Sequence, residues 1–256
     1  MNYKSISLEI DSPAATIRLN SPPYNVIDIP MMEEIFGALQ ALEEDNNIQF
    51  VLFRGAGDKL FSAGVDIADH TEDKIEMMLT KFHDIFRLIY KWDKISISVV
   101  HAPAIGGGCE LAALCDFVIA AESATFSQPE INVGCYPPAA AAAFPRIIGP
   151  KAAMDMILTG RELSAKEAKK LGLVTRVVPD DNLNEAVDEL IATLKGKSRA
   201  VLSLARKSIK AGIEWEYNLA LTKAEDIYFD ELMKTEDVKE GVSAFLEKRK
   251  PDWRHK

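Results

Sequence analysis

The segment 105–110, Ile-Gly-Gly-Gly-Cys-Glu, places a carboxylate directly after three glycines. Glycines between a strand and a helix allow a tight turn and let backbone N–H groups approach a ligand closely. The first N–H groups of a helix lack intrahelical partners and lie at the positive end of its dipole, so they can bind an anion or a developing oxyanion. Glu110 is therefore a candidate acid or base. A simple strand-to-helix turn, with Glu110 placed favourably on the dipole, explains this segment equally well.

Two further segments combine small residues or proline with acidic groups. Residues 61–67, Phe-Ser-Ala-Gly-Val-Asp-Ile, again permit close backbone approach, although an ordinary turn has the same composition. Residues 126–130, Phe-Ser-Gln-Pro-Glu, place Glu130 after a proline that fixes the local backbone. A single glutamate in a loop is usually solvated. The Gly-Ala-Gly at 55–57 lacks the third glycine of a dinucleotide-binding fingerprint, so we predict no nicotinamide site.

Composition excludes several classes of protein. The chain has 256 residues, 48% hydrophobic and 27% charged, and a net charge of −9. These values are typical of a soluble globular protein and argue against nucleic-acid binding, which needs a basic face. The N-terminal segment has no apolar run that could act as a signal peptide or membrane span, so we expect a cytoplasmic protein. Three dispersed cysteines without a CxxC pair predict neither a disulfide framework nor a metal site.

The elements that must position these groups alternate between strand and helix in the first half of the chain. Strands are predicted at 5–10 and 15–19 (a hairpin), 49–53, 96–101 and 117–120, and helices at 30–42, 74–92 and 109–114. This alternation predicts a layered α/β core. After Pro145 the pattern changes, and helices are predicted at 151–158, 165–171, 183–194, 199–211, 219–233 and 238–249. The last third should therefore be a helical extension packed on the core.

Taken together and in order, the motifs resemble those of the crotonase superfamily, the enoyl-CoA hydratases and isomerases. The matching runs are FSAGVDI (61–67), GGGCELAALCD (106–116), FSQPEINVG (126–134), LTGRELSAKEAKKLGLV (158–174) and EGVSAFLEKRKPDW (240–253). The resemblance implies an α/β fold with a (ββα)-spiral core at 1–195 and a helical trimerisation region at 196–256. It also implies a homotrimer or homohexamer.

The resemblance further implies a site for an acyl-CoA thioester. By motif position, the backbone N–H groups of Val65 and Gly107 form an oxyanion hole for the thioester carbonyl. Glu110 and Glu130 correspond to the two catalytic glutamates of the hydratases, which can divide or share the proton transfers of water addition. Isomerases of the family typically keep one glutamate, so the pair favours hydration. No cofactor and no metal are expected, since coenzyme A is part of the substrate.

Residues that the resemblance assigns to the coenzyme lie in two segments. They are Lys59, Ala63, Asp66 and Ile67 before and within the FSAGVDI run, and Phe245 and Lys248 near the C-terminus. Lys59 and Lys248 have a simpler interpretation, because exposed lysines are common.

The chain departs from the common hydratases in two places. After the second glutamate those enzymes have a Pro-Gly-Ala-Gly-Gly-like run, whereas this chain has Tyr136-Pro137-Pro138. Pro138 has no N–H to hold the attacking water, as a glycine does in the common enzymes, and Tyr136 adds a ring beside the site. The segment 68–73 also differs. There His70 and Asp69 are candidates for substrate contact, with helix capping and a solvent-facing His70 as the alternative.

These departures are most similar to one branch, the cyclohexa-1,5-diene-1-carbonyl-CoA hydratases of anaerobic benzoyl-CoA degradation. The predicted function is hydration of that thioester to 6-hydroxycyclohex-1-ene-1-carbonyl-CoA. The main alternative is an ordinary short-chain enoyl-CoA hydratase of fatty-acid β-oxidation. An isomerase, an RNA-binding protein of the same fold and a catalytically silent acyl-CoA-binding protein are further alternatives.

Overall fold

The computed structural model describes residues 3–253, apart from the side chains at 211–218, 220, 223 and 224. A six-stranded sheet with the order β1-β2-β3-β4-β6-β9 forms the centre. β1 and β2 pair antiparallel, and each following neighbour pairs parallel. The strands are β1 Ile6–Asp11, β2 Ala14–Leu19, β3 Phe50–Gly55, β4 Ile95–Val100, β6 Phe117–Ala121 and β9 Arg176–Val178. A smaller sheet contains β5 Ala104–Ile105, β7 Thr125–Ser127 and β8 Glu162–Ser164 in the order β5-β7-β8.

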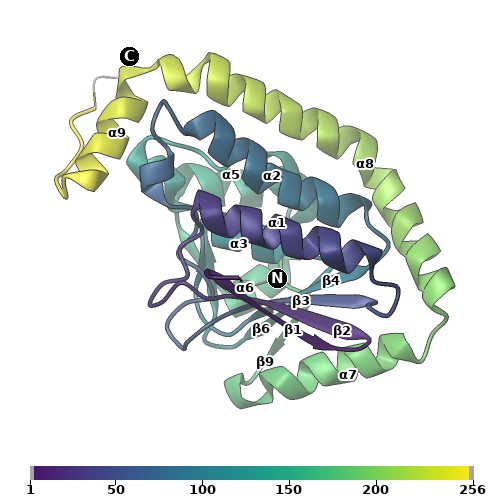
Figure 1. Ribbon diagram of the computed structural model, residues 1–256. Helices are drawn as coiled ribbons and strands as arrows, with labels where there is room; N and C mark the ends of the chain where they lie inside the picture. Colours follow the sequence, from purple (N-terminus) through teal and green to yellow (C-terminus); the bar gives the residue numbers. More distant parts are fainter. Residues whose placement is uncertain (1–2, 254–256) are drawn as a thin grey trace.

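The central strands β3 and β4 are covered on both faces, which is why they are buried along almost their whole length. Val51 and Phe53 of β3 join the large core under α1 (Ile29–Glu44) and α2 (Ile75–Lys91). Phe50 and Leu52 face the opposite way and pack in a second cluster with α7 (Leu183–Lys195). Figure 1 shows α1 and α2 on one side of the sheet and α7 on the other. The predicted α/β layering is thereby confirmed.

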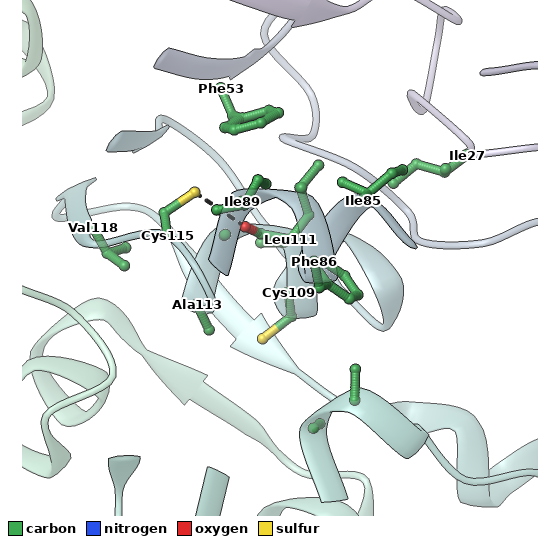
Figure 2. Packing of buried hydrophobic residues seen from close by; sticks show 14 of the residues in the cluster. Ile27, Phe53, Ile85, Phe86, Ile89, Cys109, Leu111, Ala113, Cys115 and Val118 are labelled. Atoms are coloured by element: carbon green, nitrogen blue, oxygen red, sulfur yellow. Dashed lines mark hydrogen bonds between the residues drawn. The ribbon is translucent and has the colours of Figure 1, made fainter. Parts of the chain in front are cut away.

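The short helix α3 (Gly107–Ala113) is buried along its whole length. Figure 2 shows Cys109 and Leu111 of this helix among Ile85, Phe86 and Ile89 of α2. Just beyond the helix, the Cys115 thiol donates to the Leu111 carbonyl at 3.3 Å. The first turn of α3 is therefore fixed by packing on all sides, and so is Glu110 within it.

Helices dominate after residue 137. They are α4 Pro138–Ile147, α5 Pro150–Thr159, α6 Ala165–Leu171, α7, α8 Arg199–Asp230 and α9 Glu236–Leu246. The prediction of two separate helices at 199–211 and 219–233 is wrong, because α8 is continuous over 32 residues. The segment between the two predicted helices contains Gly212, but one glycine costs a helix only about 1 kcal/mol. Figure 1 shows α8 running along the outside of the molecule from the end of α7 towards α9.

The predicted boundary at residue 195 coincides with the end of α7, and its meaning as a domain boundary stays a prediction. Within residues 3–253, no helix is long and apolar enough to cross a membrane. In the same part of the chain, no group of three His, Cys, Asp or Glu side chains is arranged to hold a metal ion.

Candidate active site

A cavity of about 420 Å³ brings together most of the residues singled out in the sequence. Its walls come from the 63–70 segment, α2, the start of α3, the turn after β7, the start of α4, and α8 and α9. Among the predicted residues, the lining includes Ala63, Val65, Ile67, His70, Gly107, Glu110, Glu130, Tyr136, Pro138 and Phe245. Three motifs that are separate in the sequence thus form one site.

Two glycines with positive φ bring the Val65 and Gly107 segments into direct contact. Gly64 has φ +91° and Gly106 has φ +54°, conformations that other residues rarely adopt. A Cβ atom on Gly64 would lie 2.7 Å from the Ile105 carbonyl oxygen and 3.1 Å from the Gly107 nitrogen. Among the described residues, neither the Val65 nor the Gly107 amide donates to another backbone group. Both N–H groups are therefore available to a ligand at the cavity wall.

Glu110 is held by the start of α4. The Ala140 amide donates to its Oε1 at 2.7 Å, and the carboxyl group is almost completely buried, with the residue only 3% exposed. Burial raises the pKa of Glu110 to about 7, although hydrogen bonds from the amides of Ala140 and Ala139 oppose this increase. Near neutral pH this carboxyl group can therefore either accept or give a proton.

Glu130 lies in the 3-10 helix η2 (Pro129–Val133), which follows β7 directly. It keeps some exposed surface where it lines the cavity but is otherwise closely surrounded by protein. A Cβ atom on Gly106 would lie only 2.7 Å from Glu130 Oε1, so a glycine at this position leaves room for the carboxylate. Burial, and secondly the charge of Glu110, raise the pKa of Glu130 well above its ordinary value.

The electrostatics of the cavity favour a shared proton. None of the described lining residues is a lysine or arginine, so no cation in the wall compensates two ionised carboxylates. Since Glu110 raises the pKa of Glu130, the two groups titrate as a pair. Near neutral pH the favoured state has one neutral and one ionised carboxyl group.

Tyr136, Pro138 and Tyr228 form an aromatic and aliphatic wall next to the glutamates. The rings of Tyr136 and Tyr228 are 5.1 Å apart, and Tyr228 comes from α8. Pro138 is the first residue of α4 and offers no N–H. The N–H groups at this end of α4 that interact with the site are those of Ala139 and Ala140, and both are directed at Glu110.

In the 68–73 segment, Asp69 has a structural role, whereas His70 is placed to contact a substrate. Asp69 does not line the cavity, because its carboxylate accepts from the Ile29 amide at 3.2 Å and from Lys74 Nζ at 3.1 Å. His70 does line the cavity, with its Nδ1 3.0 Å from the Asp66 carbonyl oxygen. Burial lowers the pKa of His70, so the ring is neutral at pH 7.

Three predicted binding residues lie outside the cavity wall. Lys59 is exposed in the turn after β3, and Lys248 is exposed beyond the end of α9. Asp66 caps the 3-10 helix Ile67–Asp69 by accepting from the Ala68 amide at 2.9 Å. Contact of these three with coenzyme A stays a prediction.

Sequence reasoning missed two polar side chains at the site. Gln128 is fully buried, and its amide nitrogen must face Glu130, where it donates to Oε1 at 3.1 Å and Oε2 at 3.2 Å. Its place two residues before Glu130 was a usable signal. His83 lines the cavity from α2 and bonds to Glu225, 142 residues away, so no local pattern pointed to it.

Comparison with known proteins identifies the family. The enoyl-CoA hydratase/isomerase family matches residues 9–256. The chain belongs to this family. It is 34% identical over 259 residues to a crotonyl-CoA hydratase of Syntrophomonas wolfei, with 99% of each chain covered. It is also 35% identical over 266 residues to a probable enoyl-CoA hydratase of Mycobacterium bovis, with 100% of each covered.

Solved structures of the family have the same fold. An enoyl-CoA hydratase from Mycobacterium avium subsp. paratuberculosis superposes with a TM-score of 0.88 at 28% identity, covering 98% of this chain and 99% of the other. The crotonase-like fold predicted from the motifs is therefore confirmed.

Proposed function

We propose that this acyl-CoA hydro-lyase adds water to cyclohexa-1,5-diene-1-carbonyl-CoA to give 6-hydroxycyclohex-1-ene-1-carbonyl-CoA. The hydratase class rests on the family and on relatives that are named as enoyl-CoA and crotonyl-CoA hydratases. The observation that carries the hydration chemistry is the pair of buried carboxyl groups beside two backbone N–H groups without a backbone partner, in a cavity whose described lining residues include no lysine or arginine.

The backbone amides of Val65 and Gly107 would bind the thioester carbonyl oxygen. When water attacks the conjugated system, negative charge accumulates on this oxygen and the thioester becomes enolate-like. Two donors fixed by the Gly64–Ile105 contact need no reorganisation to stabilise that charge. One such donor typically contributes about 3–4 kcal/mol to the stabilisation of a transition state.

Glu110 and Glu130 would carry the protons. The ionised carboxylate accepts a proton from water as its oxygen bonds to carbon, and the neutral carboxylic acid gives a proton to carbon. The raised pKa of each group keeps one proton on the pair near neutral pH, which is the state this reaction needs. In the reverse direction the same groups exchange roles. No cofactor takes part, because coenzyme A belongs to the substrate.

Pro138 and the aromatic wall support the cyclic substrate over a short straight chain. Proline at this position cannot donate to the water, and the amides of Ala139 and Ala140 are already directed at Glu110. The water is then held by the carboxyl groups without a backbone donor from Pro138. Tyr136 and Tyr228 offer flat apolar surface on which an unsaturated ring can pack.

The coenzyme would extend from the cavity towards the protein surface. Ala63 and Ile67 line the cavity and are proposed to contact the adenine end, with Asp66 between them. Lys59, Lys248 and the half-exposed Phe245 are proposed to contact the phosphate and nucleotide parts. Assembly into a homotrimer or homohexamer belongs to the same proposal.

An ordinary short-chain enoyl-CoA hydratase is the second candidate. The observation that favours it is the 34% identity to a crotonyl-CoA hydratase over almost the full length of both chains. Both candidates use the same carboxyl pair and the same backbone donors, so they differ only in the acyl group.

One absorbance assay with both thioesters separates the candidates. We expect the protein to hydrate the cyclic dienoyl-CoA with a higher kcat/KM than crotonyl-CoA. Pro138→Gly restores a backbone donor and should shift the ratio towards crotonyl-CoA by roughly tenfold, the value of one hydrogen bond. Ala141→Gly, in the same helix, is the matched control. Efficient hydration of crotonyl-CoA with no reaction of the cyclic diene would establish the second candidate.

A further inference from the structure

His70 is anchored to the same turn that carries the Val65 amide. Its Nδ1 lies 3.0 Å from the Asp66 carbonyl oxygen, and the Asp66 amide donates to the Ile27 carbonyl oxygen at 3.0 Å. Ile27 also forms a β-bridge with Val65. The His70 ring, which lines the cavity, is therefore tied to a rigid frame beside the position proposed for the thioester carbonyl.

The hydrogen bond to Asp66 determines which ring nitrogen of His70 carries the proton. A carbonyl oxygen can only accept, so Nδ1 is the donor. Burial lowers the pKa of His70, against the opposing effects of the Asp66 hydrogen bond and of the charges of Asp69 and Asp66, so the ring is neutral at pH 7. In a neutral ring with its hydrogen on Nδ1, the Nε2 atom carries a lone pair and is an acceptor.

The Nε2 atom of His70 is accessible to a ligand. No described residue bonds to it, and unlike the enclosed Nε2 of His83 it keeps accessible surface. Because Nδ1 points back at the turn, Nε2 on the far side of the ring points away from that turn. The side chain is otherwise partly buried and lines the cavity, so its accessible edge opens into the cavity. An occupant of the cavity can therefore donate a hydrogen bond to Nε2.

The charges that act on His70 indicate which part of a thioester it meets. Besides burial, the shift in its pKa comes from Asp66 and Asp69, and not from Glu110 or Glu130. Charged groups that are close together in a poorly hydrated cavity interact strongly, so His70 lies away from the carboxyl pair. The hydroxyl group that hydration adds to the acyl moiety forms at that pair. The remaining N–H and O–H donors of the thioester belong to the coenzyme.

We propose that His70 binds the pantetheine arm of the coenzyme, with its Nε2 accepting a hydrogen bond from an N–H or O–H group of the arm. Only the short 3-10 helix Ile67–Asp69 and Asp66 separate His70 from Val65. The arm begins at the thioester sulfur, next to the carbonyl group that Val65 is proposed to bind. This inference rests on the proposed function only in that the ligand is an acyl-CoA thioester. His70 then helps to hold the thioester in register with the carboxyl pair, whatever its acyl group.

Saturated thioesters that each lack one donor test this contact without requiring turnover. The probes are butyryl-CoA, two analogues in which one amide N–H of the arm is replaced by an ester oxygen, and one in which the hydroxyl group of the arm is replaced by hydrogen. Calorimetric titration gives each Kd. For one analogue we expect the wild-type protein to bind roughly 5- to 10-fold more weakly than it binds butyryl-CoA, the value of one hydrogen bond, whereas His70→Phe binds both equally. His70→Gln, which offers an amide oxygen, should recover part of the difference.

His101 provides the matched control. It is also a partly buried histidine, but it does not line this cavity. His101→Phe should therefore keep the wild-type ratio of Kd values for every analogue. Because each ratio compares two ligands on the same variant, a general loss of folded protein cannot imitate the expected result.

Two outcomes would overturn the inference. One is a set of Kd ratios that are the same in the wild-type protein and in His70→Phe for all three analogues. The other is a weaker binding of butyryl-dephospho-CoA than of butyryl-CoA that is present in the wild-type protein and absent in His70→Phe, since a phosphate contact requires a protonated ring that donates. Neither outcome depends on the hydration assay. If His70 distinguishes one analogue but the cyclic diene is not hydrated, only the proposed substrate fails. If the wild-type protein does not bind butyryl-CoA at all, the inference and the proposed function fail together.

Discussion

Two buried acidic sites in this protein respond to burial in opposite ways. At the Glu110–Glu130 cavity, burial raises both carboxyl pKa values. Asp116 is equally enclosed, and burial by itself would raise its pKa too, but Lys210 and Arg206 lower it below the ordinary value. Arg206 Nε lies 2.7 Å and Lys210 Nζ 3.1 Å from the carboxylate. The difference between the sites is therefore the presence of cations, not the degree of burial.

This contrast separates a structural carboxylate from chemically useful ones. Asp116 also accepts from the Ser96 amide and hydroxyl, so it is fully paired and stays ionised, joining α8 to the sheet. The cavity carboxyls are held by backbone and amide donors, and the described residues of the cavity wall include no lysine or arginine, so a proton can move on and off them near neutral pH. A second cavity, of about 430 Å³, includes Asp116, yet we assign no reaction to it because its carboxylate is already neutralised.

The largest expected effect is on activity, from removing the charge of either cavity carboxyl. Glu110→Gln and Glu130→Gln should each lower kcat/KM for hydration by about 10³-fold, because general acid–base groups typically contribute 10²- to 10⁴-fold. Stability should not fall, since glutamine has no charge to bury. Steady-state assays with urea unfolding of the same samples measure both quantities. Full activity in both variants would indicate a different catalytic pair.

Removing the charge of Asp116 should have the reverse result, a loss of stability with little change in activity. Asp116→Asn leaves Arg206 and Lys210 without their anion, and breaking a buried ion pair typically costs 3–5 kcal/mol. We expect the free energy of unfolding to fall by about that amount while kcat per folded molecule changes little. Urea titration gives the first value and active-site titration the second. Loss of kcat without loss of stability would contradict the comparison.

The pH dependence of stability should also differ between the sites. The folded pKa of Glu110, about 7, lies above the ordinary value of 4.5. Its contribution is therefore complete below pH 4.5 and is lost as pH rises through 7, a change of roughly 3 kcal/mol.

The contribution of Asp116 to stability depends on pH in the opposite direction. Its lowered pKa contributes stability above the ordinary value of 3.8, which is lost as pH falls through the folded pKa. Unfolding curves of wild type, Glu110→Gln and Asp116→Asn across this range test both signs. Glu110→Gln should reduce the decline between about pH 4.5 and 7 and leave the part that Glu130 contributes, and an unaltered decline would show that Glu110 is not one of its origins.

A smaller effect is expected from moving one cavity carboxyl without changing its charge. Gly106→Ala places a Cβ atom 2.7 Å from Glu130 Oε1, so the carboxylate must shift. A displacement of about 1 Å at a reacting group can cost roughly 100-fold in rate. We expect kcat to fall by that order, with a moderate loss of stability because φ is +54°. Gly57→Ala, at φ +73° but with free space around it, is the control for backbone strain alone.

The smallest effect is expected at an exposed cation that neutralises neither site. Lys59→Ala should raise KM for the thioester by about two- to fivefold at low salt, and the difference should shrink at high salt, because exposed charges are screened. The chemical step should be unchanged. Kinetics at two ionic strengths measure this, and a KM independent of Lys59 at low salt would remove the residue from the coenzyme site.

The sequence by itself determined the fold family, the α/β layering and the positions of both glutamates. These features depend on local signals, such as the glycine run before Glu110, the proline before Glu130 and the apolar strands. It could not determine that α8 is one helix, because a single glycine breaks a helix only when tertiary contacts fail to compensate for it.

Only the tertiary structure decided how the two kinds of buried carboxylate differ. Their pKa values depend on which cations come near, and Asp116 meets Arg206 only because α8 returns to the sheet 90 residues later. The His83–Glu225 bond spans 142 residues for the same reason. A residue's type sets what it can do chemically. The partners brought by distant segments set its charge, and those partners have no pattern in the local sequence.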